Sequence, residues 1–406
     1  MATFRETRSL RNERREQEHK KEERAKKSER SKRYRLLKAA VALAVAAGVV
    51  VSAWAGLGAA RLSGLTDAWR LLGRQGSGFP LDYGFANLRR AALIGPSLAL
   101  LGPTSLEVHT ASGYQALAFP QPYAAPGLKA NSGRMVLFDR DSGKFTLLSR
   151  TGKLWDKNLE HDIFCVDLNR DGAVAVGTKA ENAASEINVW DAKQNRRFAW
   201  RCDKERPSAL RLTGGSVGIC MAGTRQAGVY ARFLEFSFRQ KQPRIDITIP
   251  DAWLLGAAQL SNGWIAVGDQ AAYLIQRGAK QPQTLSYEGR ALESFDIGDR
   301  HTAVLLQDWD NRWLLRVYDR QGALALEQDF TRQPLGVQCG GSNVYLRFAD
   351  TMLRWQRSTG FRQSQGLPQG TQEAFVAGRS AYLLTLRSVE WMRLRWSLPD
   401  EAIFAS

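Results

Sequence analysis

The run WIAVG (Trp264–Gly268), introduced by the turn residues Ser261-Asn262-Gly263, shows most clearly the pattern that decides the fold of this 406-residue chain. It is short, rich in branched apolar residues and bounded by Gly, Asn and Ser, which is typical of a buried β-strand. The same pattern recurs in LALLG from Leu98, RMVLF from Arg134, AVAVG from Ala173, VGICMAG from Val217, TAVLL from Thr302, NVYLRF from Asn343 and YLLTL from Tyr382.

The eight runs start 36, 39, 44, 47, 38, 41 and 39 residues apart. Most are followed by a second run, such as INVWDAKQN (Ile187–Asn195), and a third, such as RRFAW (Arg196–Trp200). A period of about 40 residues with about four short strands predicts a blade of a β-propeller. The chain is therefore expected to be all-β, with an eight-bladed β-propeller. Seven blades, if one run is misassigned, and a solenoid are the alternatives.

The last repeat ends soon after SVEWMRLRW (Ser388–Trp396) and lacks an obvious outermost strand. The segment GFPLDY (Gly78–Tyr83) precedes the first run, taken here as the first inner strand, and could supply the missing one. Pairing between the two would close the ring and remove its open sheet edges.

Composition and charge narrow the class of protein. Apolar residues make up 44% of the chain and aromatic residues 10%, which excludes wholesale disorder, and four cysteines exclude a disulfide-stapled scaffold. The formal net charge is +17, but residues 1–38 hold 15 Lys and Arg against 7 Asp and Glu. Only +9 remains for the other 368 residues, so the basic balance is poor support for nucleic-acid binding.

An uncharged stretch of 22 residues, Ala39–Ala60, follows this charged tail, which is expected to be disordered or transiently helical. It would span about 33 Å as a helix, enough to cross a bilayer. A cleaved signal peptide ending near Ala53-Trp54-Ala55 and a buried globular helix are the less favoured alternatives. The basic residues before it predict a cytoplasmic tail at 1–38, a membrane span at 39–60, a linker at 61–77 and an extracytoplasmic propeller at 78–406.

Small residues recur at every fourth position of the predicted span. Such spacing lets two membrane helices approach closely and could support a homodimer through the span. The residues are Ala40, Ala44, Gly48, Ser52, Gly56 and Ala60.

With its charged tail, single apolar span and Phe-Pro strand, the chain resembles a family of membrane-anchored bacterial propellers of unknown function, found mostly in Firmicutes. The resemblance covers most of the chain, with runs such as SLEVHTASG (Ser105–Gly113) and GWIAVGD (Gly263–Asp269). The blades are also distantly similar to quinoprotein repeats. Asp139 to Gly143 fits that motif, but Leu147 stands where a Trp is usual. The adjacent-cysteine pair of the quinone site is absent, so this resemblance implies neither a cofactor nor redox catalysis.

Candidate sites for metal are few. Asp167, Asn169 and Asp171 copy the opening of a calcium loop, but the twelfth position is Thr178 instead of Glu, and the same residues form good hairpin turns. The turn interpretation is favoured. The cysteines are not spaced as the ligands of a zinc site are. The histidines lie in no catalytic motif. A disulfide is permitted outside the cell but is not favoured.

Two loops mix cations and aromatics, as protein-binding surfaces do. They carry Arg225 and Tyr230 in the first, and Trp309, Arg312 and Trp313 in the second. Packing on neighbouring blades is the alternative role for both.

Together these features predict a single-pass membrane protein whose propeller binds a protein or cell-envelope partner as an interaction or assembly module, and no enzyme activity. An envelope glycan- or peptide-acting enzyme, or a ligand sensor, is the alternative, since fold alone does not decide function.

Overall fold

The computed structural model describes residues 59–83, 88–226 and 228–404. The predicted tail 1–38 and all of the predicted span except Ala59 and Ala60 lie outside these residues. Within the described ranges, no helix is both long enough and apolar enough to cross a membrane. The part from Ala59 onward is one compact unit.

Eight four-stranded antiparallel sheets make up this unit. Blade 1 consists of β2–β5 (Arg90–Ile94, Ser97–Leu101, Ser105–His109, Gln115–Pro120), and blade 2 of β6–β9 (Pro126–Ala130, Met135–Asp139, Gly143–Leu148, Lys153–Leu159). Blade 3 consists of β10–β13 (Ile163–Leu168, Val174–Thr178, Ser185–Trp190, Arg196–Cys202), and blade 4 of β14–β17 (Arg206–Leu212, Ser216–Arg225, Gly228–Ser237, Ile245–Pro250). Blade 5 consists of β18–β21 (Leu254–Leu260, Gly263–Gly268, Ala271–Gln276, Gln283–Ser286), and blade 6 of β22–β25 (Ala291–Ile297, Thr302–Gln307, Trp313–Tyr318, Leu324–Phe330). Blade 7 consists of β26–β29 (Gly336–Gly340, Asn343–Arg347, Thr351–Gln356, Gly360–Gly366). Blade 8 joins β30–β32 (Glu373–Ala377, Ser380–Leu384, Ser388–Arg393) to β1 (Leu81–Asp82).

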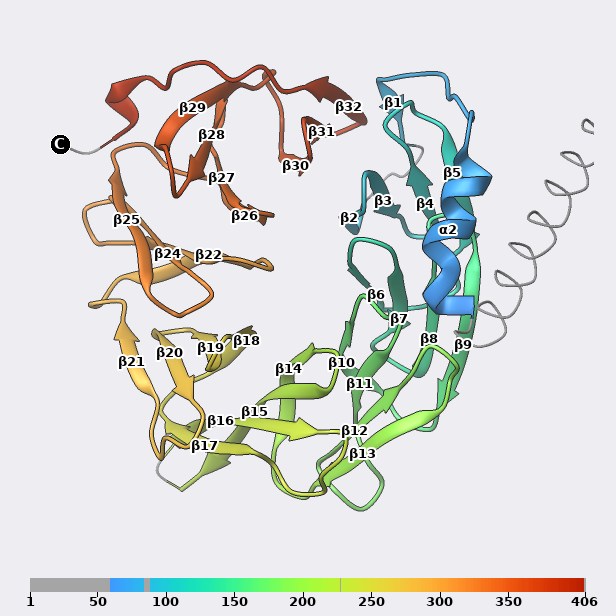
Figure 1. The fold of residues 1–406 in the computed structure, drawn as a ribbon, viewed down its shortest axis with the longest axis vertical. Coiled ribbons are helices and arrows are strands. Elements are labelled where there is room, and N and C mark those ends of the chain that lie inside the picture. The colour runs from blue at the N-terminus through green and yellow to red at the C-terminus, as the bar shows by residue number, and fades with distance from the viewer. Residues whose placement is uncertain (1–58, 84–87, 227, 405–406) are drawn as a thin grey trace, which may run out of the picture. The chain divides into compact units, whose positions relative to one another are not determined.

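The blades stand around a common axis, with the first strand of each nearest the centre (Figure 1). First strands of neighbouring blades contact one another all the way round, including β2 with β30. The predicted eight-bladed all-β propeller is therefore confirmed. The eight apolar runs, however, are the second strands, so taking the first of them as an inner strand was wrong. Another strand precedes each run and lies closer to the axis.

The second strands are largely apolar because both of their faces are covered by neighbouring blades. All residues of β3, β7, β11 and β19 are buried. Between blades 4 and 5, the Phe233 and Trp264 rings pack 5.3 Å apart. A Cβ atom at Gly218 would lie 2.7 Å from the Trp264 ring, which explains why a glycine interrupts the apolar run of β15.

Pairing between β1 and β32 closes the ring, with Leu81 opposite Val389 and Asp82 opposite Ser388. Residues 78–83 thus supply the missing outermost strand, as predicted. The Tyr83 hydroxyl donates to the carbonyl of Thr385 at 2.5 Å, and the Phe79 ring packs edge-on to Tyr382 at 5.8 Å. Strand pairing and aromatic packing together hold the two ends of the propeller.

The residues expected as a linker at 61–77 contain most of a helix, α2 (Ala59–Leu71). It contacts β9 of blade 2, and the Asp67 carboxylate is completely buried. A short 3₁₀ helix, η1 (Glu401–Ile403), ends the described chain, and beside it Phe404 bridges to Phe330 of blade 6.

We predict that Phe79→Ala lowers the free energy of unfolding by about 2 kcal/mol, because it removes a half-buried aromatic ring from the closing seam. Urea unfolding followed by tryptophan fluorescence measures this, with Leu398→Ala as the exposed control. An effect of Phe79→Ala no larger than that of the control would contradict a closing role for this segment.

Candidate functional site

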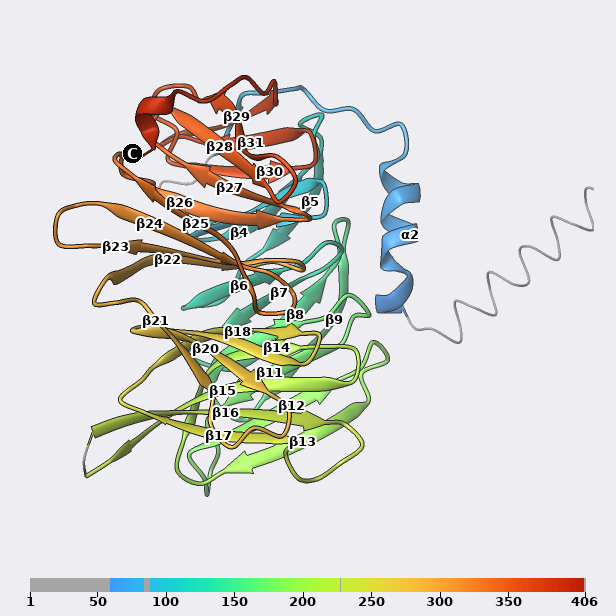
Figure 2. The same cartoon turned by 60° about the vertical axis from the view of Figure 1, so that its left-hand side comes forward.

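Each blade connects to the next on one side of the ring, called here the connection face, which also carries the turns between second and third strands. The turns between first and second strands, and between third and fourth strands, lie on the opposite side, called here the turn face. This follows from the antiparallel order of every sheet. The edge-on view of Figure 2 shows α2 on one side of the ring and the β23–β24 hairpin projecting on the other.

On the turn face, polar contacts join the turns between first and second strands of several blades. The Asn131 side chain donates to the carbonyl of Asn169 at 3.0 Å, and Asn169 donates to the carbonyl of Thr213 at 3.2 Å. Arg170 of blade 3 forms an ion pair with Asp299 of blade 6. Because these blades are not neighbours, the pair reaches across the centre of the ring.

Asp167, Asn169 and Asp171, which resemble the opening of a calcium loop, lie at or next to one of these turns. One Asp167 oxygen accepts from the backbone N–H of Leu212 at 2.7 Å, while Lys129 approaches the other at 4.0 Å. Asn169 binds Thr213, and Asp171 is exposed at the tip of the turn. Among the described residues, no group of three or more His, Cys, Asp or Glu is arranged to hold a metal ion. Asp167 and Asn169 thus take part in hydrogen bonds that join blade 3 to blade 4.

A cavity of about 1130 Å³ opens between blades 6, 7, 8 and 1. Its lining includes Arg89 and Arg90 at the start of β2, and Glu373 at the start of β30, which places its mouth on the connection face. It reaches Asp296 in the second half of β22 and Gln338 in the middle of β26. Leu335 and Leu386 also line it.

Cations outnumber anions in this lining, with Arg89, Arg90 and Arg347 against Asp296 and Glu373. Burial lowers the pKa of Arg347, an effect that the charge of Glu373 opposes. The Arg347 Nη2 atom donates to the carbonyl of Leu335 at 3.1 Å, whereas its buried Nη1 atom has no hydrogen-bond partner among the described residues. The described residues therefore leave part of the hydrogen-bonding capacity of this guanidinium unsatisfied.

Asp296 is held differently from a surface carboxylate. Burial raises its pKa, while hydrogen bonds from the backbone N–H groups of Cys339 and Ile297, and the charges of Lys129 and Arg211, oppose the rise. Three arginines against two carboxyl groups leave the lining with a positive balance. The cavity favours an anionic or acidic ligand.

Large apolar side chains are exposed around the connection face from blade 4 to blade 8. Trp309 is 88% exposed and Leu386 is 77% exposed. The others are Val229, Trp253 and Leu335. Exposed apolar groups around a concave site are typical of a protein-binding surface.

The structure separates the five predicted partner-binding residues into two groups. Arg225, Trp309 and Arg312 are exposed, and the Asp308 carboxylate accepts from the N–H of Arg312 at 2.9 Å to shape that loop. Tyr230 and Trp313 are buried. The Arg225 guanidinium lies 4.3 Å from the centroid of the Tyr230 ring.

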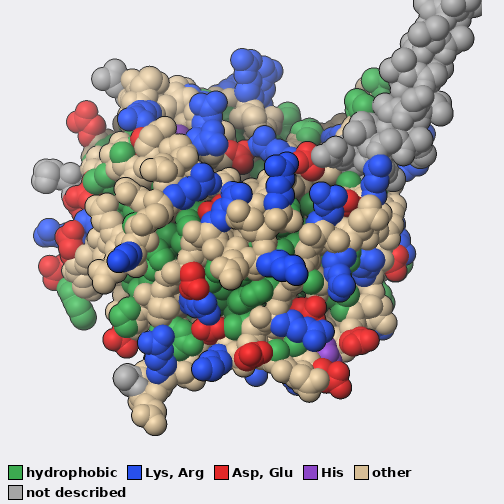
Figure 3. Space-filling model, turned by 60° about the horizontal axis from the view of Figure 1, so that its bottom comes forward, with side chains coloured by type: hydrophobic (Ala, Val, Ile, Leu, Met, Phe, Trp, Pro, Cys, Tyr) green, Lys and Arg blue, Asp and Glu red, His purple; other side chains and the backbone are tan. Residues whose placement is uncertain are grey.

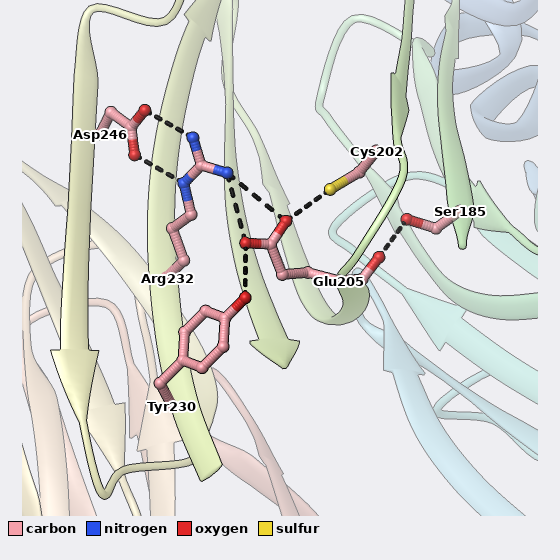
Figure 4. A network of polar contacts seen from close by, with 6 residues as sticks. All are labelled: Ser185, Cys202, Glu205, Tyr230, Arg232 and Asp246. Atoms are coloured by element: carbon pink, nitrogen blue, oxygen red, sulfur yellow. Dashed lines mark hydrogen bonds and ion pairs between the residues drawn. The ribbon is translucent and has the colours of Figure 1, made fainter. Parts of the chain in front are cut away.

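Tyr230 belongs to a buried network around Glu205 that joins blades 3 and 4 (Figure 4). Its hydroxyl donates to Glu205 Oε1 at 3.0 Å, and Arg232 donates to both oxygens at 3.3 and 3.4 Å. The Cys202 thiol also donates to this carboxylate, and Arg232 makes a bidentate pair with Asp246 at 2.6 Å. The network fixes the outer strands of the two blades to each other.

Reasoning from sequence missed this network and the cavity, because both combine residues from segments far apart in the chain. Glu205 stands in an ordinary polar stretch, and the cavity lining comes from four blades. The only signal for the cavity was the basic pair Arg89-Arg90 before the first run. All four cysteines are free, and burial raises the pKa of each thiol.

Figure 3 shows how charged side chains are distributed on one side of the molecule. On the side shown in Figure 3, Lys and Arg side chains are interspersed with Asp and Glu and form no continuous basic stripe.

Comparison with solved structures shows the propeller fold. The chain is similar to the computationally designed Ika8 protein, with a TM-score of 0.54 and 11% identity over 77% of this chain and 98% of that one. It is similar to a eukaryotic initiation factor, with a TM-score of 0.51 and 9% identity over 78% and 90%. BamB from Moraxella catarrhalis has a TM-score of 0.47 and 12% identity over 80% and 99%.

No protein-family model and no curated protein matches the chain. The resemblance to membrane-anchored bacterial propellers from Firmicutes therefore gains no support from these comparisons. At such low sequence identities, the similarity to solved structures shows the fold alone, and the function has to be inferred from the site.

We predict that Glu205→Gln lowers the free energy of unfolding by about 2 kcal/mol, because it removes the charge that binds Arg232 and Tyr230. Chemical denaturation measures the change, with the exposed Glu181→Gln as the matched control. Equal stability of the two variants would show that the network is dispensable for holding blades 3 and 4 together.

A second prediction concerns pH. Burial lowers the pKa of His301, the charges of Arg357 and Arg300 lower it further, and Asp319 opposes them; its Nδ1 atom has no partner among the described residues. The unfolded chain therefore binds a proton on this residue at a higher pH than the folded chain. The stability contributed by neutral His301 is present above a pH of about 6.5 and is lost as the pH falls below it.

His301→Phe keeps a ring against Trp355, which lies 5.3 Å away, and removes the titrating group. We expect the wild type to lose more stability than this variant between pH 7 and pH 5 in urea titrations, with His161→Gln as control. A parallel loss in the wild type and His301→Phe would rule out this contribution.

Proposed function

We propose that this protein is a single-pass membrane protein whose extracytoplasmic propeller binds a protein or cell-envelope partner on its connection face. The observation that carries the proposal is the combination of a basic cavity with exposed apolar side chains on one face of a rigid ring. Leu335 and Leu386 line the cavity, and Val229, Trp253 and Trp309 are exposed elsewhere on the same face.

The chemistry of the face favours a partner segment that is both apolar and acidic. Trp309 and Leu386 offer surface that a partner would remove from water, while Arg89, Arg90 and Arg347 favour carboxylates within the cavity. Aromatic and arginine side chains are the residues that most often dominate binding energy at protein interfaces. Arg90 and Arg347 stand on β2 and β27, and these strands hold them in place, so the two side chains lose little freedom on binding.

Membrane anchoring rests on the sequence. The uncharged residues Ala39–Ala60, together with the excess of basic residues before them, support a cytoplasmic N-terminus and an outer propeller. Anchoring would hold the propeller at the cell surface, where its partner would be a protein or another component of the envelope.

Trp309→Ala and Leu386→Ala are each predicted to weaken partner binding about tenfold, since each removes a large exposed apolar side chain from the face. The test is affinity purification of the full-length protein from detergent-solubilised source membranes, followed by titration with the stoichiometric partner recovered. Leu324→Ala is the matched control, because Leu324 is exposed next to the turn face.

Equal losses in Leu324→Ala and the two face variants would contradict a specific role for the connection face. Turnover of an envelope glycan or peptide by the purified protein, abolished by Arg347→Ala, would instead favour the enzymatic alternative.

A further inference from the structure

Helix α2 is attached to the propeller by a buried carboxylate. One Asp67 oxygen accepts from the hydroxyls of Ser149 at 2.8 Å and Thr151 at 2.7 Å. The other accepts from the backbone N–H of Arg150 at 3.0 Å, and the Arg150 side chain lies 3.7 Å away as an ion partner. These residues form the turn between β8 and β9, on the turn face of blade 2. Four donors fix the helix at this one point.

The opposite side of α2 is apolar and faces solvent. Leu65 is 71% exposed, Trp69 78% and Leu72, just past the last residue of the helix, 75%. At about 100° per residue, Leu65 and Trp69 lie about 40° apart around the helix, with Asp67 roughly opposite. This is the reverse of an ordinary surface helix, in which the apolar side packs on the protein and the polar side meets water. We call these three residues the α2 stripe.

The chain that leads into α2 indicates what covers the stripe. Residues 39–58 carry no charge and run directly into the helix, which begins at Ala59. Leu65 follows Ala60 by five residues, a rise of about 8 Å along the helix. The polar headgroup layer on each side of a bilayer is about 5–8 Å thick. Where the uncharged segment leaves the hydrocarbon, Leu65 follows within about one headgroup layer. Trp69 and Leu72 follow Ala60 by about 14 and 18 Å along the chain direction, so they reach the same layer when α2 lies along the membrane surface.

The residue types in and around α2 also suit that layer. Tryptophan is enriched at the membrane–water interface, and leucine is typical of the apolar side of interfacial helices. Arg61, Arg70 and Arg74 follow the uncharged run, with no Lys or Glu between them and one Asp, the buried Asp67. Arg70 Nη1 donates to the Thr151 hydroxyl of the propeller at 3.4 Å, so Arg61 and Arg74 are the two that would attract anionic lipid headgroups.

We propose that the α2 stripe lies in the headgroup region of the membrane, so that Asp67 couples the orientation of the propeller to the bilayer surface. This inference rests on the proposed membrane anchoring and goes beyond it. An anchor alone would leave the propeller free to tumble at the end of its span, whereas an attached interfacial helix holds one side of the ring against the lipid.

The test uses the full-length protein in vesicles of phosphatidylcholine and phosphatidylglycerol. Leu65→Cys, Trp69→Cys and Leu72→Cys variants are each spin-labelled; burial raises the pKa of the native thiols and slows their reaction. Immersed labels collide more with oxygen, which concentrates in lipid, than with a water-soluble nickel complex. We expect this result at all three positions and the reverse at Trp309→Cys, which lies on the connection face.

A label at Ser52→Cys separates the two proposals. If the Ser52 label is immersed while the stripe labels remain in water, the inference fails and the anchor stands. If the Ser52 label is also in water, both fail. If the stripe labels lose access to oxygen and nickel alike, a second copy or another protein covers the stripe and the inference is overturned.

The coupling through Asp67 has its own readout. Pulsed spin-resonance distances between labels at Trp69→Cys and Leu324→Cys should form one narrow distribution in the otherwise native protein. Asp67→Ala should broaden it, because the helix loses its attachment, while the Trp69 label stays immersed. An unchanged distribution would remove Asp67 from the role assigned to it.

Discussion

The ring of sheets has to be closed between its last blade and its first segment, and here the short pairing of β1 with β32 closes it. The same seam borders the cavity, because Tyr83 and Thr385 take part in closure and also line it. The candidate site therefore lies where the two ends of the propeller meet. Its shape depends on non-local pairing that forms only when the whole ring is assembled.

Within each blade, the second strands contribute mainly to stability, and the first strands carry groups suited to recognition. Second strands are buried on both faces and supply the apolar packing between blades, whereas first strands are partly exposed and carry charged groups such as Lys129, Asp167, Arg211 and Asp296 toward the axis. Farther out, the Glu205 network joins two blades with polar contacts. Apolar packing between the second strands thus stabilises the ring, and charged and polar groups lie on the strands inside and outside this packed layer.

Periodic features could be predicted from the sequence, and individual contacts could not. The second strands repeat as apolar runs because every blade buries them in the same way, so the fold, the blade number and the closing segment 78–83 were within reach. First strands were overlooked because they are half-exposed and lack a uniform pattern. Tyr230 and Trp313 looked like binding residues because they stand in polar loops beside cations, but neighbouring strands cover both of them.

The position of α2 on the turn face determines how the molecule would be approached. The exposed apolar groups and the cavity mouth lie on the opposite side of the ring, so the thickness of the disc separates them from the attachment point of the helix. A propeller resting on lipid through α2 would present its open side to the surrounding compartment. Partners diffusing freely there would meet it directly, whereas a partner embedded in the same bilayer would need a tether long enough to pass round the rim.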